Sequence, residues 1–420
     1  MEKILNAKYK DVLKKIIIQN QSRLRNLKVI PRSIEIEEHG NYVFVGLRRA
    51  GKTYLFYQVI KAQYHIEEVL FVNFEDERLI EFSYKELDLL LEAYSELYKK
   101  KPVLFLDEIH NIKNWEKFVR RLADNDYKVM ITGSNAKMLS SDISTTLGGR
   151  FFNIEVFPLS FIEFLKFNKL ELEQNFEYSN QLIKIKELFA IFLQYGGLPE
   201  LIKFKNKREY LSNIYQKLFY GDIIARYNIS NPKALKLLVK KLAESVNNET
   251  SINRIKNMIK SVGVPIGSST LFEYIDYLRE SFIINDITNY ANKFVERETK
   301  KKYYLSDTGL LALFLIDQDT KLLENLVYIE LNRRHKDGVY YFKRKLEVDF
   351  YIPEEKILIQ VSYNINEEET RKRELKALLL AMNELNIDEG KIITFDIEDQ
   401  ILIDNKIIHI IPAWKWLLKV

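Results

Sequence analysis

From Asn41 onward, short and fully apolar runs alternate with stretches whose apolar residues recur at helical spacing. Apolar strands separated by helices are typical of a parallel sheet covered on both faces. The pattern predicts an α/β domain over residues 1–160 that ends after FNIEVFPLS. The expected strands are NYVFVG (41–46), VLFVNF (69–74), PVLFLD (102–107) and KVMITGS (128–134), and the expected helices are 52–64, 84–99 and 115–124.

The pattern changes after Pro158, and three further parts are expected. Amphipathic helical stretches over residues 161–228, interrupted by the tight turn YGGLPE, indicate a helical lid or linker. Three helical patterns and the strand-like runs FIINDITNY and KKYYLSD follow in residues 229–315, in the order of a winged helix. Residues 316–420 show a helix, three strands, a helix, the strand KIITF, and a terminal strand and helix, which predicts a second α/β domain.

Composition excludes several kinds of site and leaves the partner open. With no cysteine and only five histidines, we expect no disulfide, no thiol catalysis and no cysteine or histidine metal cluster. The net charge of +5 is the small difference between 64 basic and 59 acidic residues, so it does not argue for nucleic acid. Because no run is apolar enough to span a membrane and no secretory signal is visible, we expect a cytoplasmic protein.

The segment GLRRAGKT, from Gly46 to Thr53, has the spacing of a phosphate-binding loop. Gly46 and Gly51 would let backbone N–H groups surround a phosphate chain, Lys52 would reach the terminal phosphates, and the Thr53 hydroxyl would bind Mg²⁺. A strand before the loop and a helix after it supply the context that the motif requires. We place Arg49 and Tyr54, inside and directly after the motif, at the same ATP site.

A second motif, VLFLDE, ends a buried strand with two carboxylates. Asp107 would hold Mg²⁺ through water, and Glu108 would orient the attacking water as the catalytic base. A lone pair of acids at a strand end would more simply cap a helix, so the interpretation depends on the phosphate-binding loop. Together the two motifs predict hydrolysis of ATP rather than phosphoryl transfer to a metabolite.

Polar residues at the ends of two other strands are weaker candidates for this site. Ser134 or Asn135, after the strand KVMITGSN, would lie beside the γ-phosphate as a sensor. Asn73, at the end of VLFVNF, would hold Glu108 in an inactive orientation, and a simple capping role is an equal alternative.

An arginine near the developing charge accelerates phosphoryl transfer by roughly 10³–10⁵-fold. Such a residue is called an arginine finger, and Arg150, in the glycine-flanked segment LGGR, is the candidate for it. A plain surface position for Arg150 is the alternative. The competing arginines are Arg48, Arg49, Arg120 and Arg121.

At this point the chain resembles the AAA-type ATPases of prokaryotes that carry a C-terminal DUF4143 region. The segments that carry the resemblance are GLRRAGKT, NFEDER, LDEIHNI, ITGSNAKML, LGGR, FPLSFIEF, YGGLPE, DIIARY, YYLSDTGL and EVDF, in that order. The resemblance covers most of residues 40–420. It implies an AAA-like nucleotide domain, then a winged helix, then a domain similar to the PD-(D/E)XK nucleases.

Nuclease chemistry in that last domain requires two acids and a lysine around magnesium. The chain has Asp349 in EVDF, but Gln360 and Ser362 stand where an acid and the lysine are needed. Glu324 matches the additional helix carboxylate that the resemblance implies. We therefore expect no nuclease activity and a degenerate fold used for binding or assembly, with a vestigial metal site at Glu324, Asp349 and Gln360 as the alternative.

The charged residues of the expected winged helix argue both for and against DNA binding. The third helix, SSTLFEYIDYLRE, carries Glu273, Asp276 and Glu280 where phosphates would approach. Cations gather instead in the segment KALKLLVKKLAE (233–244) and in the expected wing, at Lys293, Arg297, Lys300, Lys301 and Lys302. The wing cations would follow a DNA backbone or simply face solvent.

The leading hypothesis is an ATP-driven switch or motor that acts on DNA through backbone contacts, with an oligomer allowed. The alternative is a switch for assembly with a protein partner that involves no nucleic acid. An ATP-gated nuclease is the least favoured of the three.

Overall fold

The computed structural model describes residues 2–139, 141–316 and 319–418. Contacts between residues divide the chain into two compact units. The first unit runs to Val156 and includes Glu280–Phe282, and the second comprises Phe157–Arg279 and Ile283–Val420. The expected end of the first domain near residue 160 lies close to this division.

The first unit is built on a five-stranded parallel sheet with the order β2-β3-β4-β1-β5. Its strands are β1 (Asn41–Val45), β2 (Val69–Asn73), β3 (Val103–Asp107), β4 (Val129–Gly133) and β5 (Phe151–Glu155). Its helices are α1 (Glu2–Asn26), α2 (Lys52–Gln63), α3 (Asp88–Tyr98), α4 (Trp115–Asp124) and α5 (Ser141–Thr146). The predicted strands and helices of this domain are confirmed.

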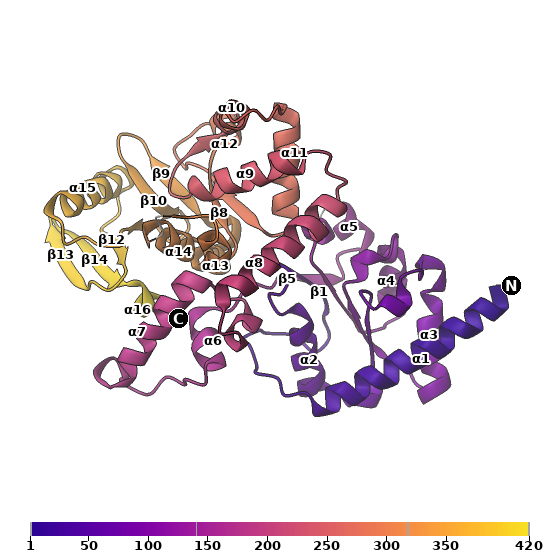
Figure 1. Ribbon diagram of the computed structural model, residues 1–420. Helices are drawn as coiled ribbons and strands as arrows, with labels where there is room; N and C mark the ends of the chain where they lie inside the picture. The colour runs from indigo at the N-terminus through magenta and orange to yellow at the C-terminus, as the bar shows by residue number, and fades with distance from the viewer. Residues whose placement is uncertain (1, 140, 317–318, 419–420) are drawn as a thin grey trace. The chain divides into compact units, whose positions relative to one another are not determined.

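The long helix α1 covers the β2 edge of the sheet, a role that the sequence pattern did not predict. It packs along α3, as Figure 1 shows. Asn20 Nδ2 donates to the Phe71 carbonyl and Gln21 Nε2 donates to the Val69 carbonyl, each at 3.0 Å. Two side chains thus satisfy acceptors that an exposed edge strand would leave open to pairing with another chain.

The second unit begins with helices and continues with a small sheet. The helices are α6 (Phe161–Phe167), α7 (Gln181–Tyr195), α8 (Lys207–Lys217), a π-helical segment (Leu218–Ala225), α9 (Pro232–Glu244), α10 (Ile252–Ser261) and α11 (Ser268–Glu280). The strands are β6 (Thr250–Ser251), β7 (Ile284–Ile287) and β8 (Lys300–Leu305), and α12 (Phe294–Thr299) lies between β7 and β8. They form an antiparallel sheet with the order β6-β8-β7. The three helices and two longer strands match the predicted pattern, whereas β6 and α12 were not predicted.

A six-stranded mixed sheet completes the second unit, in the order β13-β14-β12-β11-β10-β9. Its strands are β9 (Tyr340–Lys343), β10 (Glu347–Ile352), β11 (Ile357–Val361), β12 (Glu389–Thr394), β13 (Asp399–Ile403) and β14 (Lys406–Pro412). The helices of this region are α13 (Thr308–Ala312), α14 (Asp319–His335), α15 (Glu368–Leu385) and α16 (Ala413–Leu418). Helix α15 connects the parallel strands β11 and β12 and buries Leu378 and Met382 against the sheet. Among the described helices, none combines the length and the apolar character that crossing a membrane requires.

Asp307 joins two motifs that lie far apart in the sequence. Its fully buried carboxylate accepts hydrogen bonds from the Gly197 N–H at 2.8 Å and from the Leu310 N–H at 3.2 Å. A Cβ atom on Gly196 would lie 2.1 Å from the Asp307 carboxylate, so only glycine fits there. The YGGLPE turn therefore packs directly on the start of α13.

Replacing this carboxylate should destabilise the second unit. Asp307→Ala leaves buried N–H groups without an acceptor, so we expect a loss of about 2–4 kcal/mol in the free energy of unfolding. Urea unfolding followed by circular dichroism measures it. Asp337→Ala, at an exposed aspartate of the same unit, is the control and should change stability little. Equal stability of the two variants would contradict this role of Asp307.

Candidate nucleotide site

The loop between β1 and α2 has a backbone that requires its glycines. Gly46 has φ 144°, and a Cβ atom there would lie 2.3 Å from the Val156 carbonyl oxygen. Gly51, directly before α2, has φ 102°, which side chains rarely tolerate. The chain therefore turns sharply at the carboxyl end of β1 and enters the first turn of α2, and a glycine-containing loop that leads into a helix N-terminus is the geometry that binds phosphate.

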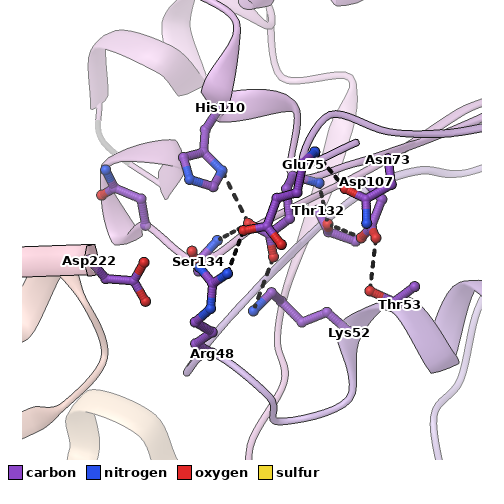
Figure 2. A network of polar contacts seen from close by, with 12 residues as sticks. Arg48, Lys52, Thr53, Asn73, Glu75, Asp107, His110, Thr132, Ser134 and Asp222 are labelled. Atoms are coloured by element: carbon purple, nitrogen blue, oxygen red, sulfur yellow. Dashed lines mark hydrogen bonds and ion pairs between the residues drawn. The ribbon is translucent and has the colours of Figure 1, made fainter. Parts of the chain in front are cut away.

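The Lys52 side chain lies within the curve of this loop. Its ammonium donates to the Gly46 carbonyl at 3.0 Å and to the Leu47 carbonyl at 3.2 Å, and only 4% of the residue is exposed. The same nitrogen lies 3.7 Å from Glu108 Oε1. The charge is thus held on the loop, next to a carboxylate, where a phosphate chain would approach (Figure 2).

Asp107 connects three elements of the sheet edge. Thr53 Oγ1, from the first turn of α2, donates to Asp107 Oδ2 at 2.8 Å. Thr132 Oγ1, from β4, donates to Asp107 Oδ1 at 2.6 Å, as Figure 2 shows. Burial raises the pKa of the Asp107 carboxyl, and a bound cation would offset that cost. A hydroxyl and a carboxylate oxygen in contact are the donor set that Mg²⁺ prefers.

Glu108 is held in an unusual backbone conformation beside Lys52, Arg48 and His110. Its φ of 52° lies in the left-handed region, where strained residues often belong to active sites. Glu108 Oε2 accepts from the Ser134 N–H at 3.1 Å and lies 3.4 Å from His110 Nδ1. Burial alone raises the pKa of Glu108, but Lys52, His110 and Arg48 outweigh it and bring the pKa below its ordinary value. The carboxylate is therefore ionised at neutral pH and able to accept a proton.

The two candidate amides make backbone contacts. Asn73 lies opposite Asp107 in the strand register, and its Oδ1 accepts from the Glu75 N–H at 2.8 Å, which fits the capping alternative. Asn135 Oδ1 accepts from the Lys137 N–H at 2.8 Å. The Ser134 backbone, rather than either amide side chain, makes the described contact to Glu108. Roles for Asn73 and Asn135 in nucleotide chemistry stay predictions.

Arg49 and Tyr54, the two other residues predicted at the ATP site, lie in the loop and on the helix that follows it. Arg49 has φ 64° within the turn. Tyr54 is 38% exposed on α2, and its ring meets that of Tyr57 edge to face with 5.4 Å between centroids. Both lie at the loop, and their contact with a nucleotide stays a prediction.

Arg150 lies near the amino ends of the strands, whereas the phosphate-binding loop of the same chain lies at their carboxyl ends. It directly precedes β5, whose first residue, Phe151, pairs with Asn41 at the amino end of β1, whereas the loop follows the carboxyl end. Arg150 Nη1 pairs with Asp124 Oδ1 at 2.8 Å. About 13 Å of strand separates the two edges, so Arg150 does not lie beside the nucleotide site of its own chain.

Three residues near the acids were missed or assigned otherwise. Thr132 is a buried polar side chain within the apolar strand VMITG, and that interruption was a signal for a role at the site. His110 follows the DE pair by two residues and contacts Glu108. Arg48 was considered only as a finger, but it lowers the pKa of Glu108 and pairs with Glu75 at 2.6 Å.

In the second unit, the residues of the predicted vestigial site lie near one another but are already engaged. Glu324 and Asp349 both contact the Lys302 ammonium, at 3.3 Å each. Gln360 Nε2 donates to Glu374 at 2.7 Å, and its Oε1 accepts from the Asp349 N–H. The expectation that Lys302 faces a DNA backbone is wrong, because this side chain is 0% exposed.

Comparisons with known proteins give the class and then the family. A family model described as an AAA domain matches residues 38–165, and one described as a domain of unknown function (DUF8612) matches residues 186–321. The first unit is therefore an AAA domain of the P-loop ATPase class. The chain belongs to the family of the uncharacterized protein MJ1544 of Methanocaldococcus jannaschii, to which it is 37% identical over 97% of this chain and 96% of that protein.

Two further similarities are more distant. An uncharacterized protein of Haemophilus influenzae is 29% identical over 77% of this chain and 83% of its own length. The Walker-type ATPase PABY2304 of Pyrococcus abyssi aligns over 69% of this chain and 99% of its own, with 14% identity and a TM-score of 0.44, too low to establish a shared overall fold. The resemblance to DUF4143 proteins stays a prediction, since the model that matches after the AAA domain is DUF8612.

Thr132 offers a test of the hydrogen-bonded chain at the sheet edge. Thr132→Val removes the hydroxyl that donates to Asp107 and accepts from the Glu108 N–H, while side-chain volume is kept. Because it removes a partner of a ligand residue, we expect Mg²⁺-dependent ATP hydrolysis to fall roughly 10–100-fold. Thr132→Ser keeps the hydroxyl and should stay within a few-fold of the wild type. Equal rates in the two variants would contradict the assignment.

Proposed function

We propose that the protein is a Mg²⁺-dependent ATPase. The observation that carries the proposal is the convergence of Lys52, Thr53, Asp107 and Glu108 at one edge of the parallel sheet. The match to an AAA domain over residues 38–165 supports the same class of chemistry.

Each residue has a role that follows from its position. The loop N–H groups and Lys52 would bind the phosphates of ATP, and Thr53 and Asp107 would hold the metal. Magnesium, when bound, would neutralise charge that develops on the phosphate oxygens. Glu108, kept ionised by the neighbouring cations, would take the proton of the attacking water.

Two variants separate binding from hydrolysis. Glu108→Gln keeps the shape of the base but cannot accept the proton, so turnover should fall by roughly 10²–10⁴-fold while ATP still binds. Lys52→Ala removes the phosphate contact and should weaken binding itself. Fluorescent-nucleotide titration and phosphate release measure the two effects. Undiminished turnover by Glu108→Gln would exclude it as the base.

Arg150 lies at the end of the sheet away from the nucleotide site of its own chain. It could therefore serve as an arginine finger only for the nucleotide bound to another copy of the protein. We propose that it acts on the nucleotide of a neighbouring copy. Turnover of Arg150→Ala should then fall roughly 10³–10⁵-fold. Mixing Arg150→Ala with Lys52→Ala should restore part of the activity, because the second variant supplies Arg150 and the first binds ATP.

A matched control exists for the finger. Arg120 contacts the same Asp124, at 3.7 Å, so Arg120→Ala tests the loss of that surface pair alone and should leave turnover nearly unchanged. An Arg150→Ala protein that is inactive and gains nothing in the mixture would contradict action between copies.

We further propose that α9, α10, α11 and the β6-β8-β7 sheet form a winged helix, and that the final sheet is a nuclease-like fold. The support is connectivity: β6 lies between α9 and α10, and α14, three antiparallel strands, α15 and β12 follow in nuclease-like order. These assignments, the boundaries at residues 228 and 315, and a cytoplasmic location remain proposals.

Within this fold, a switch that acts on a protein partner is better supported than one that acts on DNA. Three of the five cations of the expected wing are engaged within the protein: Lys302 is buried, Lys301 pairs with Asp286 at 3.1 Å, and Arg297 donates to the Asn292 carbonyl at 2.8 Å. Helix α11 exposes Glu273 and Asp276, which would repel phosphates. We therefore propose the protein-directed switch that the sequence left as the alternative.

A further inference from the structure

Lys302 of β8 lies at the centre of a buried cluster of acids in the second unit. Its ammonium is 2.7 Å from Glu347 Oε1, 3.3 Å from Glu324 Oε1 and 3.3 Å from Asp349 Oδ1. These acids come from α14 and β10, two elements that follow β8 in the sequence. Three carboxylates thus surround one side-chain nitrogen, at the position where a cation would have to lie to contact all three.

While Lys302 is in place, further hydrogen bonds to the acids add to the contacts that a metal ion would have to displace. Tyr304 Oη donates to Glu324 Oε1 at 2.8 Å, and the Val361 N–H donates to Asp349 Oδ2 at 2.9 Å. Among the residues that the structure describes, no group of three or more histidine, cysteine, aspartate or glutamate side chains is arranged to hold a metal ion. A divalent metal therefore does not fit beside Lys302.

The burial of the cluster also separates it from substrates. Lys302 is 0% exposed, and the side chains of Glu324 and Asp349 are 3% and 9% exposed. A phosphodiester would have to reach the cation to be cleaved, and this cation is covered by protein. Cleavage by the nuclease-like fold is therefore not expected, in agreement with Gln360 and Ser362 at the positions of the missing acid and lysine.

The charges within the cluster favour a permanent ammonium. Burial alone lowers the pKa of a lysine, but Glu324, Asp349 and Glu347 together raise the pKa of Lys302 above its ordinary value. Lys343 adds a second cation at the rim, 2.9 Å from Glu347 Oε2. A buried pair or cluster of this kind costs little while it is complete and several kcal/mol when one partner is removed.

We propose that the Lys302 ammonium takes the place of a divalent metal in the acid cluster of the nuclease-like domain, and so fixes β8 to α14 and β10. The cation belongs to the chain, so the three acids have a cationic partner without any bound ion. The domain is then a metal-independent scaffold, and the small sheet moves with it as one body. This proposal does not depend on ATP hydrolysis, and its test uses no nucleotide.

The test compares Mn²⁺ binding by the full chain without nucleotide, followed by electron paramagnetic resonance and by the melting temperature. Lys302→Ala frees the acids and should create a Mn²⁺ site, so saturating Mn²⁺ should raise the Tm of this variant by roughly 5 °C or more. The wild type should show no such shift. In Lys302→Ala/Asp349→Asn the shift should be lost.

Lys343→Ala is the matched control, because Lys343 contacts the same Glu347 but is 42% exposed. It should lower stability slightly and gain no Mn²⁺ response. A folded Lys302→Ala protein that ignores Mn²⁺ would overturn the proposal.

If Lys302→Ala does not fold with or without Mn²⁺, the proposal is tested by Mn²⁺ binding and DNA cleavage of the wild-type protein. Absence from the wild type of any Mn²⁺ binding that depends on Asp349 supports the proposal. Mn²⁺ binding or Mg²⁺-dependent DNA cleavage by the wild type that Asp349→Asn abolishes would overturn it, since the acids would then serve a metal despite Lys302.

Discussion

The first unit depends on the placement of Asp107, a fully buried carboxylate that joins the ends of three neighbouring elements. Thr53 from α2 and Thr132 from β4 both donate to it, so the helix that follows the loop and two strands of the sheet are fixed at one point. A buried carboxylate is costly without such partners. The same geometry leaves oxygen ligands, an ammonium and an ionised glutamate within a few ångströms, which is the requirement for hydrolysing a nucleotide.

The second unit also contains buried carboxylates, but their partner is an ammonium of the chain. Its buried acids, Glu324 and Asp349, both contact the internal cation Lys302. A site that depends on a bound ion can switch with ion concentration, whereas an internal ammonium cannot. In the second unit, Lys302 thus joins the small sheet to α14 and to the C-terminal sheet without a bound ion.

Much of this fold was predictable because its strands are fully buried and its helices are periodic. The same strong patterns placed Lys52, Thr53, Asp107 and Glu108 at one edge. The strand β13 was missed because its exposed, mixed sequence DQILI gives little signal, although the Asp404–Asn405 turn that follows was a hairpin signal. The helix α1 was missed because its purpose, to cover a strand edge, lies in tertiary contacts.

Other misses concern partners that are distant in sequence. Lys302 belongs to a run of cations, and the run alone predicts a solvated wing. Its acids lie 22 and 47 residues further along the chain, so only the folded structure brings them together. Arg150 is a comparable case, since the edge of the sheet on which it lies depends on the register of β5 against β1.

The central claim, a nucleotide-hydrolysing site that works on a protein partner rather than on DNA, is tested most directly by steady-state phosphate release from purified protein. The rate is measured with and without Mg²⁺, and with and without single-stranded and duplex DNA at low and moderate salt. The account predicts hydrolysis that requires Mg²⁺ and is unchanged by either DNA. Stimulation by DNA that weakens steeply as salt rises would contradict it, and so would a complete lack of Mg²⁺-dependent hydrolysis.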